Sequence, residues 1–306
     1  MTKPALPEHS DGIHLTLDEL LLYKAQAIHW LPPARSVWSL SQGIHQSSKL
    51  GRGMDFSEVR QYQPGDDIRS IDWRVTARTG KPHTKLFSEE KETPVILYLD
   101  LTQSMFFGSS LLLKSVQLAH MASLICWLSV AKGDRIGAVI DNGDRLIDLK
   151  PAGRQRGALH VLQALINEHN RVIASDARPQ AGSMAPAIQA LHRLCPKGSE
   201  IILLSDFVRL EADLHPAIRQ LRQHNYLRFV QLSDPLEHGE TRFRGIEQVS
   251  DLQRTIWLDF SSKITRQRLA DSFQSKQEQI QSLARSVASS YMSLSSNQPL
   301  LKQLIG

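Results

Sequence analysis

Short apolar runs and amphipathic stretches alternate along most of this chain. The β-rich apolar runs predict strands at residues 94–101, 134–141, 145–151, 200–206 and 227–232. Helical spacing of apolar positions predicts helices at residues 109–131, 157–169, 184–194 and 211–224. The first of these helices is apolar on nearly all sides, which indicates that it is buried. Because strands that alternate with helices form mostly parallel sheets covered on both faces, the pattern predicts an α/β domain.

Turn and cap signals set the limits of other elements. Asn142-Gly143 joins two predicted strands and indicates a β-hairpin. Thr16-Leu17-Asp18-Glu19 is typical of a capping box and predicts a helix that runs to Ala27. Residues 31–92 are rich in Gly, Pro, Arg and Asp and have few periodic runs, so we expect a small module of short strands and turns there.

The C-terminal third has a more polar pattern. Two short edge strands are expected at residues 246–249 and 255–258, and a long polar helix is predicted over 263–293. The serine-rich residues 286–296 are expected to be a fraying end. The whole pattern predicts an N-terminal helix and module at 1–92, the α/β domain at 93–260 and a C-terminal helical extension at 261–306.

Composition adds few constraints. The chain has 306 residues, a net charge of +5 and two cysteines, Cys126 and Cys195, which both fall in apolar helical patterns. The basic residues are scattered, so nucleic acid is not the expected partner. Two buried thiols fit a reducing compartment. Neither a signal peptide nor an apolar run long enough to span a membrane is evident, so a cytoplasmic protein is expected.

The candidate chemistry lies where two predicted strands end. Asp100 ends one apolar strand and is followed by Thr102 and Ser104, and Asp206 ends a second strand. In an open parallel sheet, these carboxyl ends are where ligands bind. Carboxylates and hydroxyls suit Mg²⁺ or Ca²⁺, and Mg²⁺ fits a half-open site better because Ca²⁺ prefers more ligands. We therefore expect a site for Mg²⁺, with Mn²⁺ or Ca²⁺ as alternatives, that leaves one position for a partner's oxygen.

These residues also allow other interpretations. An aspartate followed by Ser or Thr often caps a helix, and Asp206 would suit a helix that begins near Glu211. An aspartyl-phosphate phosphatase would need a second aspartate where Thr102 stands. The patterns of a P-loop, a dinucleotide fingerprint and the common zinc motifs are absent from the sequence. The occurrence of two strand-end aspartates favours the metal site.

With both aspartates placed, the chain resembles the von Willebrand factor type A fold and its metal-ion-dependent adhesion site. The signature of that site is Asp-x-Ser-x-Ser, a later Thr and a later Asp. Asp100, Thr102 and Ser104 match the first element, with Thr in place of the first Ser, and Asp206 matches the last. Ser183, in a Gly-Ser pair before a predicted helix, is the candidate for the Thr element.

A second stretch resembles the hallmark of the domain-of-unknown-function 58 family. It runs from Gly51 through Pro64-Gly65-Asp66-Asp67 to Trp73 and Arg78, and the resemblance covers roughly residues 35–240. It implies a type A-like domain that assists MoxR-type AAA+ ATPases as an adaptor or co-chaperone. Many members have membrane segments ahead of the hallmark, and none is evident in this sequence.

The charged residues of the hallmark allow two interpretations. They could form a network that fastens the module, or they could form a surface on which a partner docks, and Trp73 suits both. The residues concerned are Arg60, Asp66, Asp67, Arg69, Asp72, Trp73 and Arg74.

The expected function is recognition rather than catalysis. The resemblance implies a non-enzymatic adaptor that holds an ion through Asp100, Thr102, Ser104, Ser183 and Asp206. A carboxylate of a MoxR-type ATPase or its client would complete the coordination shell of that ion. Two alternatives remain open from the sequence. One is a magnesium-dependent hydrolase or phosphatase that uses the same ion, and the other is a structural interaction protein with an empty site.

Overall fold

The computed structural model describes residues 5–27, 55–88, 92–175, 182–240, 243–250 and 255–305. The chain divides into two compact units. The larger unit comprises Met1–Ser41 and Thr93–Gly306, and the smaller unit comprises Gln42–Glu92. The predicted boundary at residues 260/261 therefore falls inside the larger unit.

A six-stranded sheet forms the centre of the larger unit, with the strand order β10-β7-β6-β3-β4-β5. All neighbouring strands are parallel except the pair of β4 and β5, which is antiparallel. When only the strands of this sheet are numbered in chain order, the order is the doubly wound 3-2-1-4-5-6. This confirms the predicted α/β fold, which is similar to the von Willebrand factor type A fold. The strands are β3 (Pro94–Asp100), β4 (Arg135–Asp141), β5 (Leu146–Ala152), β6 (Glu200–Ser205), β7 (Tyr226–Ser233) and β10 (Ser290–Ser295).

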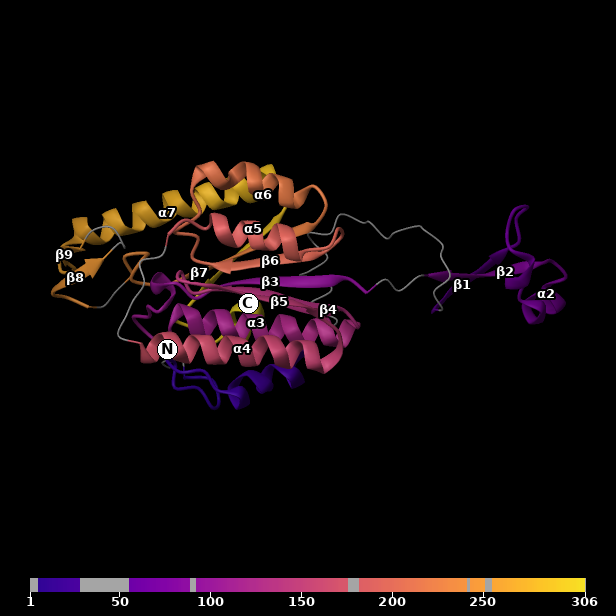
Figure 1. The fold of residues 1–306 in the computed structure, drawn as a ribbon, viewed down its shortest axis with the longest axis horizontal. Helices are drawn as coiled ribbons and strands as arrows, with labels where there is room; N and C mark the ends of the chain where they lie inside the picture. Colours follow the sequence, from indigo (N-terminus) through magenta and orange to yellow (C-terminus); the bar gives the residue numbers. More distant parts are fainter. Residues whose placement is uncertain are drawn as a thin grey trace. The chain divides into compact units, whose positions relative to one another are not determined.

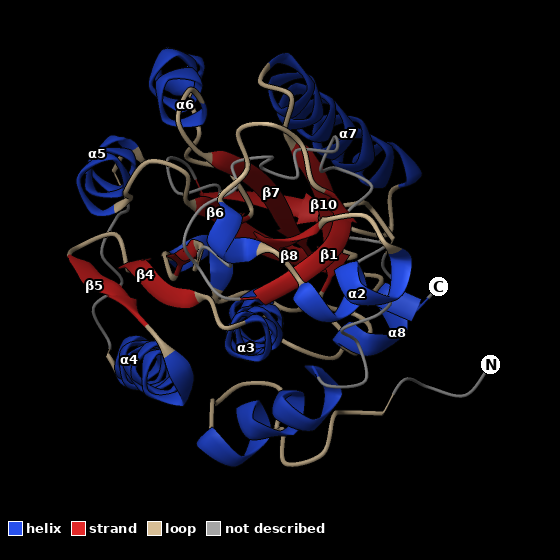
Figure 2. Ribbon diagram, turned by 90° about the vertical axis from the view of Figure 1, so that its right-hand side faces the viewer, coloured by secondary structure: helices blue, strands red, loops and turns tan. Residues whose placement is uncertain are grey.

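Helices cover both faces of this sheet (Figures 1 and 2). One face carries α3 (Lys114–Lys132) and α4 (Arg154–Ala174). The other face carries α5 (Ala185–Leu194), α6 (His215–Arg222) and α7 (Lys263–Ser286). The short helix α8 (Leu300–Ile305) packs beside α3. None of the helices in the described ranges is long and apolar enough to cross a membrane.

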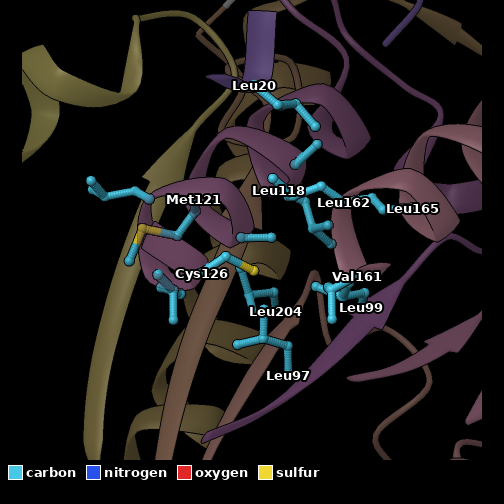
Figure 3. Close-up of a cluster of buried hydrophobic side chains, with 14 of the residues drawn as sticks. Leu20, Leu97, Leu99, Leu118, Met121, Cys126, Val161, Leu162, Leu165 and Leu204 are labelled. Atoms are coloured by element: carbon cyan, nitrogen blue, oxygen red, sulfur yellow. The ribbon is translucent and has the colours of Figure 1, made fainter. Parts of the chain in front are cut away.

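Side-chain alternation along the strands builds one core on each face. In β3, Leu97 and Leu99 enter the core under α3 and α4, whereas Ile96 and Tyr98 enter the core under α5, α6 and α7. Figure 3 shows the first core, where side chains of the sheet meet those of α3, α4 and the N-terminal helix. The strands are buried along nearly their whole length, as expected for a sheet covered on both faces.

Helix α3 is buried on nearly all sides because other helices cover what the sheet does not. The N-terminal helix, residues 17–27, lies below α3 and α4 in Figure 1. The Thr16 hydroxyl caps this helix as predicted, by accepting the N–H of Glu19 at 3.3 Å. The Glu19 side chain instead forms a fully buried contact with His120 of α3, at 2.6 Å. The first helix is therefore held on the core by a buried contact between polar side chains as well as by apolar packing.

Several elements begin or end away from their predicted limits. The predicted hairpin at Asn142-Gly143 is confirmed, with Gly143 at φ 88°. Helix α3 begins at Lys114 rather than at Ser109, because the backbone N–H and hydroxyl of Ser109 donate to the carboxylate of Asp234. Helix α4 is longer than predicted, and the predicted helix at 211–224 is a 3₁₀ turn, η3 (Ala212–Leu214), followed by α6.

The predictions for the C-terminal region were partly wrong. Helix α7 ends at Ser286, and the serine-rich stretch after it is strand β10, which pairs in parallel with β7. The sequence hid this strand because its apolar content is small, although Leu294 is 1% exposed. Strands β8 (Ile246–Ser250) and β9 (Thr255–Asp259) are not edges of the main sheet but form their own antiparallel pair.

The smaller unit contains the predicted short strands and turns. Strands β1 (Asp55–Gln61) and β2 (His83–Ser88) pair antiparallel, and between them lie the 3₁₀ turn η1 (Ile68–Ser70) and helix α2 (Trp73–Thr79). The Asp67 carboxylate caps η1 by accepting the N–H of Arg69. The Asp72 carboxylate caps α2 by accepting the N–H groups of Arg74 and Val75. Local capping therefore explains two of the hallmark aspartates.

Replacing Leu294 tests whether β10 belongs to the core. Leu294→Ala should lower the free energy of unfolding by about 2–5 kcal/mol, because it removes a buried side chain and leaves a cavity. Ser293→Ala, at the neighbouring exposed position, should change it by less than about 0.5 kcal/mol. Urea unfolding of both variants measures this. Equal effects would mean that the strand is not packed against the core.

The contact between α3 and α4 predicts a loss of stability in acid. Burial lowers the pKa of His169 to about 4, and its Nε2 lies 3.0 Å from the Ser115 hydroxyl. The unfolded chain takes up a proton near pH 6.5, whereas the folded chain does so only near pH 4. Stability should therefore be full above pH 6.5 and fall by about 3 kcal/mol as the pH drops to 4.

Comparing wild type with His169→Gln isolates this effect from other acid-sensitive groups. The difference in unfolding free energy between the two proteins should change steadily between pH 6.5 and 4. Chemical denaturation at several pH values gives the measurement. A difference that is constant over this range would show that His169 is not held neutral by the fold.

Candidate binding site at the carboxyl ends of β3 and β6

The site lies where the strand order reverses direction along the chain. From β3 the chain continues to β4 on one side, and the later strand β6 pairs with β3 on its other side. Ligands of doubly wound sheets bind in the crevice at such a point. The loop after β3, which includes the 3₁₀ turn η2 (Gln103–Met105), and the loop after β6 meet at this edge. The structure thus brings together Asp100, Thr102, Ser104 and Asp206.

Asp100 is buried, and both of its carboxylate oxygens accept hydrogen bonds. Oδ1 accepts the N–H of Thr102 at 3.1 Å and the Thr102 hydroxyl at 2.7 Å. Oδ2 accepts the Ser205 hydroxyl at 2.5 Å. The Thr102 and Ser205 hydroxyls therefore hold the carboxylate in one orientation, with neighbouring loops supplying its donors.

Arg209 supplies a positive charge that the sequence analysis missed. Its guanidinium lies 2.6 Å from Asp141 and 3.5 Å from Asp100, and it donates to the Tyr98 hydroxyl at 2.8 Å. It also reaches the backbone carbonyl of Gly182, at 3.3 Å. Its position three residues after Asp206 was the available signal, but a surface location is the usual expectation for arginine. Here Arg209 joins the ends of β3, β4 and β6 from the core side.

Asp206 is buried on the other side of the site. Its Oδ1 accepts the N–H of Val208 at 3.1 Å, and its Oδ2 lies 2.9 Å from the ammonium of Lys114. The same ammonium lies 2.5 Å from Glu237, in the loop after β7. Lys114 is the first residue of α3 and is only 1% exposed. No feature of the sequence distinguishes this lysine from the other polar residues of an apolar helix.

For each of the two aspartates, burial raises the pKa of the carboxyl group, whereas a neighbouring positive charge lowers it. Burial raises the pKa of Asp100, and the attraction of Arg209 offsets this only in part. Burial also acts to raise the pKa of Asp206, but Lys114, the Ser104 hydroxyl and the N–H of Val208 together outweigh it and the pKa is lowered. Burial acts to lower the pKa of Lys114, yet Asp206 and Glu237 raise it above its usual range. At neutral pH the site therefore holds a charged Lys114–Asp206 pair.

The loop after β6 contains backbone strain. Phe207 has φ 58°, in the left-handed region that bulky residues rarely adopt, and its side chain is fully buried. Its N–H donates to the Ser205 hydroxyl at 2.8 Å. Such a conformation costs on the order of 1–3 kcal/mol and is found mostly at functional sites. It turns the chain so that Val208 is 46% exposed directly beside the buried Asp206.

Ser104 and Ser183 differ in their surroundings. The Ser104 hydroxyl oxygen is buried, and its proximity to Asp206 helps to lower the pKa of that carboxylate. Ser183 is exposed, and its hydroxyl accepts the N–H of Ala185 at the start of α5. Because Arg209 donates to the carbonyl of Gly182, the segment that holds Ser183 lies next to the site. Ser104 thus lies beside Asp206, whereas the Ser183 hydroxyl is engaged at the start of α5.

The hydrogen bonds and ion pairs of these residues determine whether they could bind a divalent ion. The carboxylate and hydroxyl ligand types, with the buried Ser104 hydroxyl beside Asp206, favour such an ion. The carboxylates do not, because both oxygens of Asp100 accept internal donors and Asp206 is paired with Lys114. Within the described ranges no three His, Cys, Asp or Glu side chains gather as metal ligands. The arrangement therefore does not fit a divalent ion.

Helix capping, the simpler interpretation, accounts for part of the geometry. Asp100 and Asp206 each accept the backbone N–H of the residue two positions on, at 3.1 Å in both cases. Neither of them begins an α-helix, because η2 is only a short 3₁₀ turn and α6 begins at His215. Local turn formation and long-range ion pairing thus share the same carboxylates.

The hallmark residues of the smaller unit form a mostly local network. Arg60 pairs with Asp66 at 2.7 Å, and Asp72 pairs with Lys85 at 3.4 Å in addition to capping α2. Arg69 is exposed without an ion-pair partner among the described residues, and Trp73 is 67% exposed. The network interpretation therefore explains the aspartates, whereas the exposed Trp73 keeps a docking role open.

Removing Arg209 should be strongly destabilising. Arg209→Met leaves Asp100 and Asp141 buried without their positive partner, and this should cost about 3–5 kcal/mol of unfolding free energy. Arg193→Met is the matched control, because Arg193 is 65% exposed in its side chain and lies 3.9 Å from Asp148. The control should change stability by less than about 1 kcal/mol. Denaturant unfolding of both variants tests this, and similar losses would argue against the buried network.

Chains from Bacteroides are among the solved structures that are similar to this one. One is the hypothetical protein BatB from Bacteroides thetaiotaomicron, with a TM-score of 0.41, 14% identity, and coverage of 69% of this chain and 93% of that one. The other is an aerotolerance-related membrane protein from Bacteroides fragilis, with a TM-score of 0.42, 13% identity, and coverage of 70% and 98%. Both TM-scores are low, and neither similarity bears on function.

Sequence comparison gives a firmer relationship. Uncharacterized proteins of Mycobacterium tuberculosis and Mycobacterium bovis are 34% identical to this chain over 171 residues, which are 54% of this chain and 51% of each relative. The chain thus spans about half the length of these curated relatives. The family model described as "Protein of unknown function DUF58" matches residues 58–281. This match covers most of the chain, which therefore belongs to the DUF58 family.

Proposed function

We propose that this protein is a protein-binding adaptor whose recognition surface lies at the carboxyl ends of β3 and β6. The observation that supports this most is the combination of a buried, internally paired charge network with exposed apolar side chains from the same two loops. Phe107, in the loop after β3, is 37% exposed, and Val208, in the loop after β6, is 46% exposed. Apolar anchors next to rigid polar groups are typical of interface centres.

The buried network would keep this surface rigid. The backbone carbonyl of Phe107 accepts the N–H of Lys114, at 2.8 Å, and the N–H of Val208 donates to Asp206. Asp206 and Lys114 are themselves paired, so the backbone of each of these two residues is hydrogen-bonded to a member of the same ion pair. A surface that is already ordered loses little conformational entropy when a partner binds, which favours affinity.

Binding agrees better with this geometry than hydrolysis does. A phosphatase that forms an aspartyl-phosphate would need a carboxylate oxygen of Asp100 that is open to the substrate. Asp100 is 2% exposed, and its oxygens accept hydrogen bonds from Thr102 and Ser205. The geometry therefore supports a recognition role in preference to a catalytic one.

The proposed partner is a MoxR-type AAA+ ATPase or a client of that ATPase. The support for this choice is the family resemblance of the hallmark segment, to which the DUF58 match adds the family membership. An adaptor would contact the ATPase through one surface and the client through another. The carboxyl-edge surface and the exposed Trp73 of the smaller unit are the two candidate contacts.

Replacing an exposed apolar side chain of this surface by a charged one tests the proposal. Val208→Asp and Phe107→Asp should each weaken binding to the purified MoxR-type ATPase of the same organism by about 30-fold or more, as loss of an interface anchor does. Leu159→Asp is the matched control, because Leu159 is also 37% exposed but lies on α4. Binding is measured by biolayer interferometry with the full chain.

Val208→Asp, Phe107→Asp and the control distinguish the possible outcomes. Binding that is lost in Val208→Asp and Phe107→Asp and kept in Leu159→Asp supports the proposed surface. Binding that is kept in all three places the contact elsewhere and contradicts the proposal. Circular dichroism of each variant shows whether it is folded, so that a loss of binding is not mistaken for a loss of structure.

A further inference from the structure

We propose that Lys114 is the resident cation of this site, an internal ammonium in the place of the divalent ion that the type A-like signature leads one to expect. The site would then need no Mg²⁺ or Mn²⁺ for its charge balance. This inference concerns how Asp206 is neutralised, so it does not depend on the identity or the existence of a binding partner.

The position of the ammonium is fixed by its surroundings. Lys114 is 1% exposed, and its Nζ lies 2.9 Å from Asp206 and 2.5 Å from Glu237. The backbone N–H of Lys114 donates to the carbonyl of Phe107, at 2.8 Å. The long side chain therefore enters the site from a fixed helix start, and two carboxylates receive its charge.

Neighbouring turns hold the second carboxylate in place. Glu237 accepts the N–H of Asp234 through its other oxygen, at 2.9 Å. Asp234 in turn is fully buried and accepts donors from Ser109 and Ser296. The loop after β7 is thus tied to the start of α3 and to the end of β10. Moving Lys114 away from Asp206 would require this whole set of contacts to change.

A divalent ion would compete with this arrangement on charge and on space. An ion bound to Asp206 would sit about 2.1 Å from a carboxylate oxygen, within a few ångströms of the ammonium. In a buried site, two positive charges this close repel each other strongly. On the side of Asp100, the Arg209 guanidinium has the equivalent effect, at 3.5 Å from that carboxylate. Each of the two aspartates therefore already has an internal cation.

Wild type should not bind a divalent ion, whereas a variant without the ammonium should bind one. In Lys114→Met, Asp206 and Ser104 remain while the competing charge is gone. A divalent ion should then be able to bind, because the Ser104 hydroxyl beside Asp206 and the carboxylates that have lost the ammonium are the ligand types that Mg²⁺ and Mn²⁺ prefer. Lys114→Gln is a second variant, which keeps hydrogen bonding to both carboxylates without the charge.

The experiment measures Mn²⁺ binding by electron paramagnetic resonance and melting temperature with MgCl₂ or EDTA, on the full chain. Wild type is expected to bind no Mn²⁺ and to melt at the same temperature in both solutions. Lys114→Met should melt roughly 5–15 °C lower, because a buried carboxylate has lost its partner. It should bind one Mn²⁺ and regain part of the lost melting temperature with Mg²⁺.

Glu237→Gln is the control, since it leaves Lys114 and Asp206 paired and should not bind Mn²⁺. Stoichiometric Mn²⁺ binding by wild type that is abolished in Asp206→Asn would overturn the proposal. So would a failure of both lysine variants to bind Mn²⁺, because the lysine would then not stand in the place of an ion. If Lys114→Met does not fold, the wild-type and Lys114→Gln measurements decide between these outcomes.

Discussion

Two carboxylates buried at the carboxyl edge of the sheet are the constraint on which the rest of the site depends. A buried charge without a partner is strongly destabilising, so Asp100 and Asp206 each require a positive charge or several donors from within the protein. Arg209 meets this need for Asp100 and also joins Asp141 and Tyr98. Lys114 meets it for Asp206. The start of α3 and the loops after β6 and β7 are held where they are by these contacts.

Side-chain alternation in the sheet decides which cation serves which aspartate. Asp100 shares the strand face of Tyr98, whose ring enters the core under α5, α6 and α7, and Arg209 approaches from there. Asp206 follows β6 and meets Lys114 of α3, the helix that packs on the opposite face. Two aspartates that lie next to each other in the sheet order therefore belong to two separate ion-pair systems. The strained Phe207 is the link between them along the chain.

This arrangement bears on the proposed role in protein binding. A site whose charges are balanced internally offers a surface of fixed shape, whereas a site that waits for a metal ion offers a surface that depends on the ion. The exposed Phe107 and Val208 stand on loops that the ion pairs fix, so shape and apolar contact would carry the affinity. The buried pairs would contribute specificity through rigidity rather than through direct contact.

The sequence by itself determined the fold class, most of the strands and helices, and the meeting of Asp100, Thr102, Ser104 and Asp206 at one edge. It could do so because apolar periodicity and strand-end positions are local signals. It did not reveal β10, whose single well-buried apolar residue, Leu294, gives too weak a pattern to stand out from a serine-rich tail.

The ion pairs of the site were decided only by the tertiary structure. Lys114 and Asp206 are 92 residues apart, and Arg209 and Asp141 are 68 residues apart. No local pattern marks a lysine or an arginine as the one that will be buried against a distant carboxylate. Which charges meet depends on how helices pack across a sheet, and that packing is a property of the whole chain.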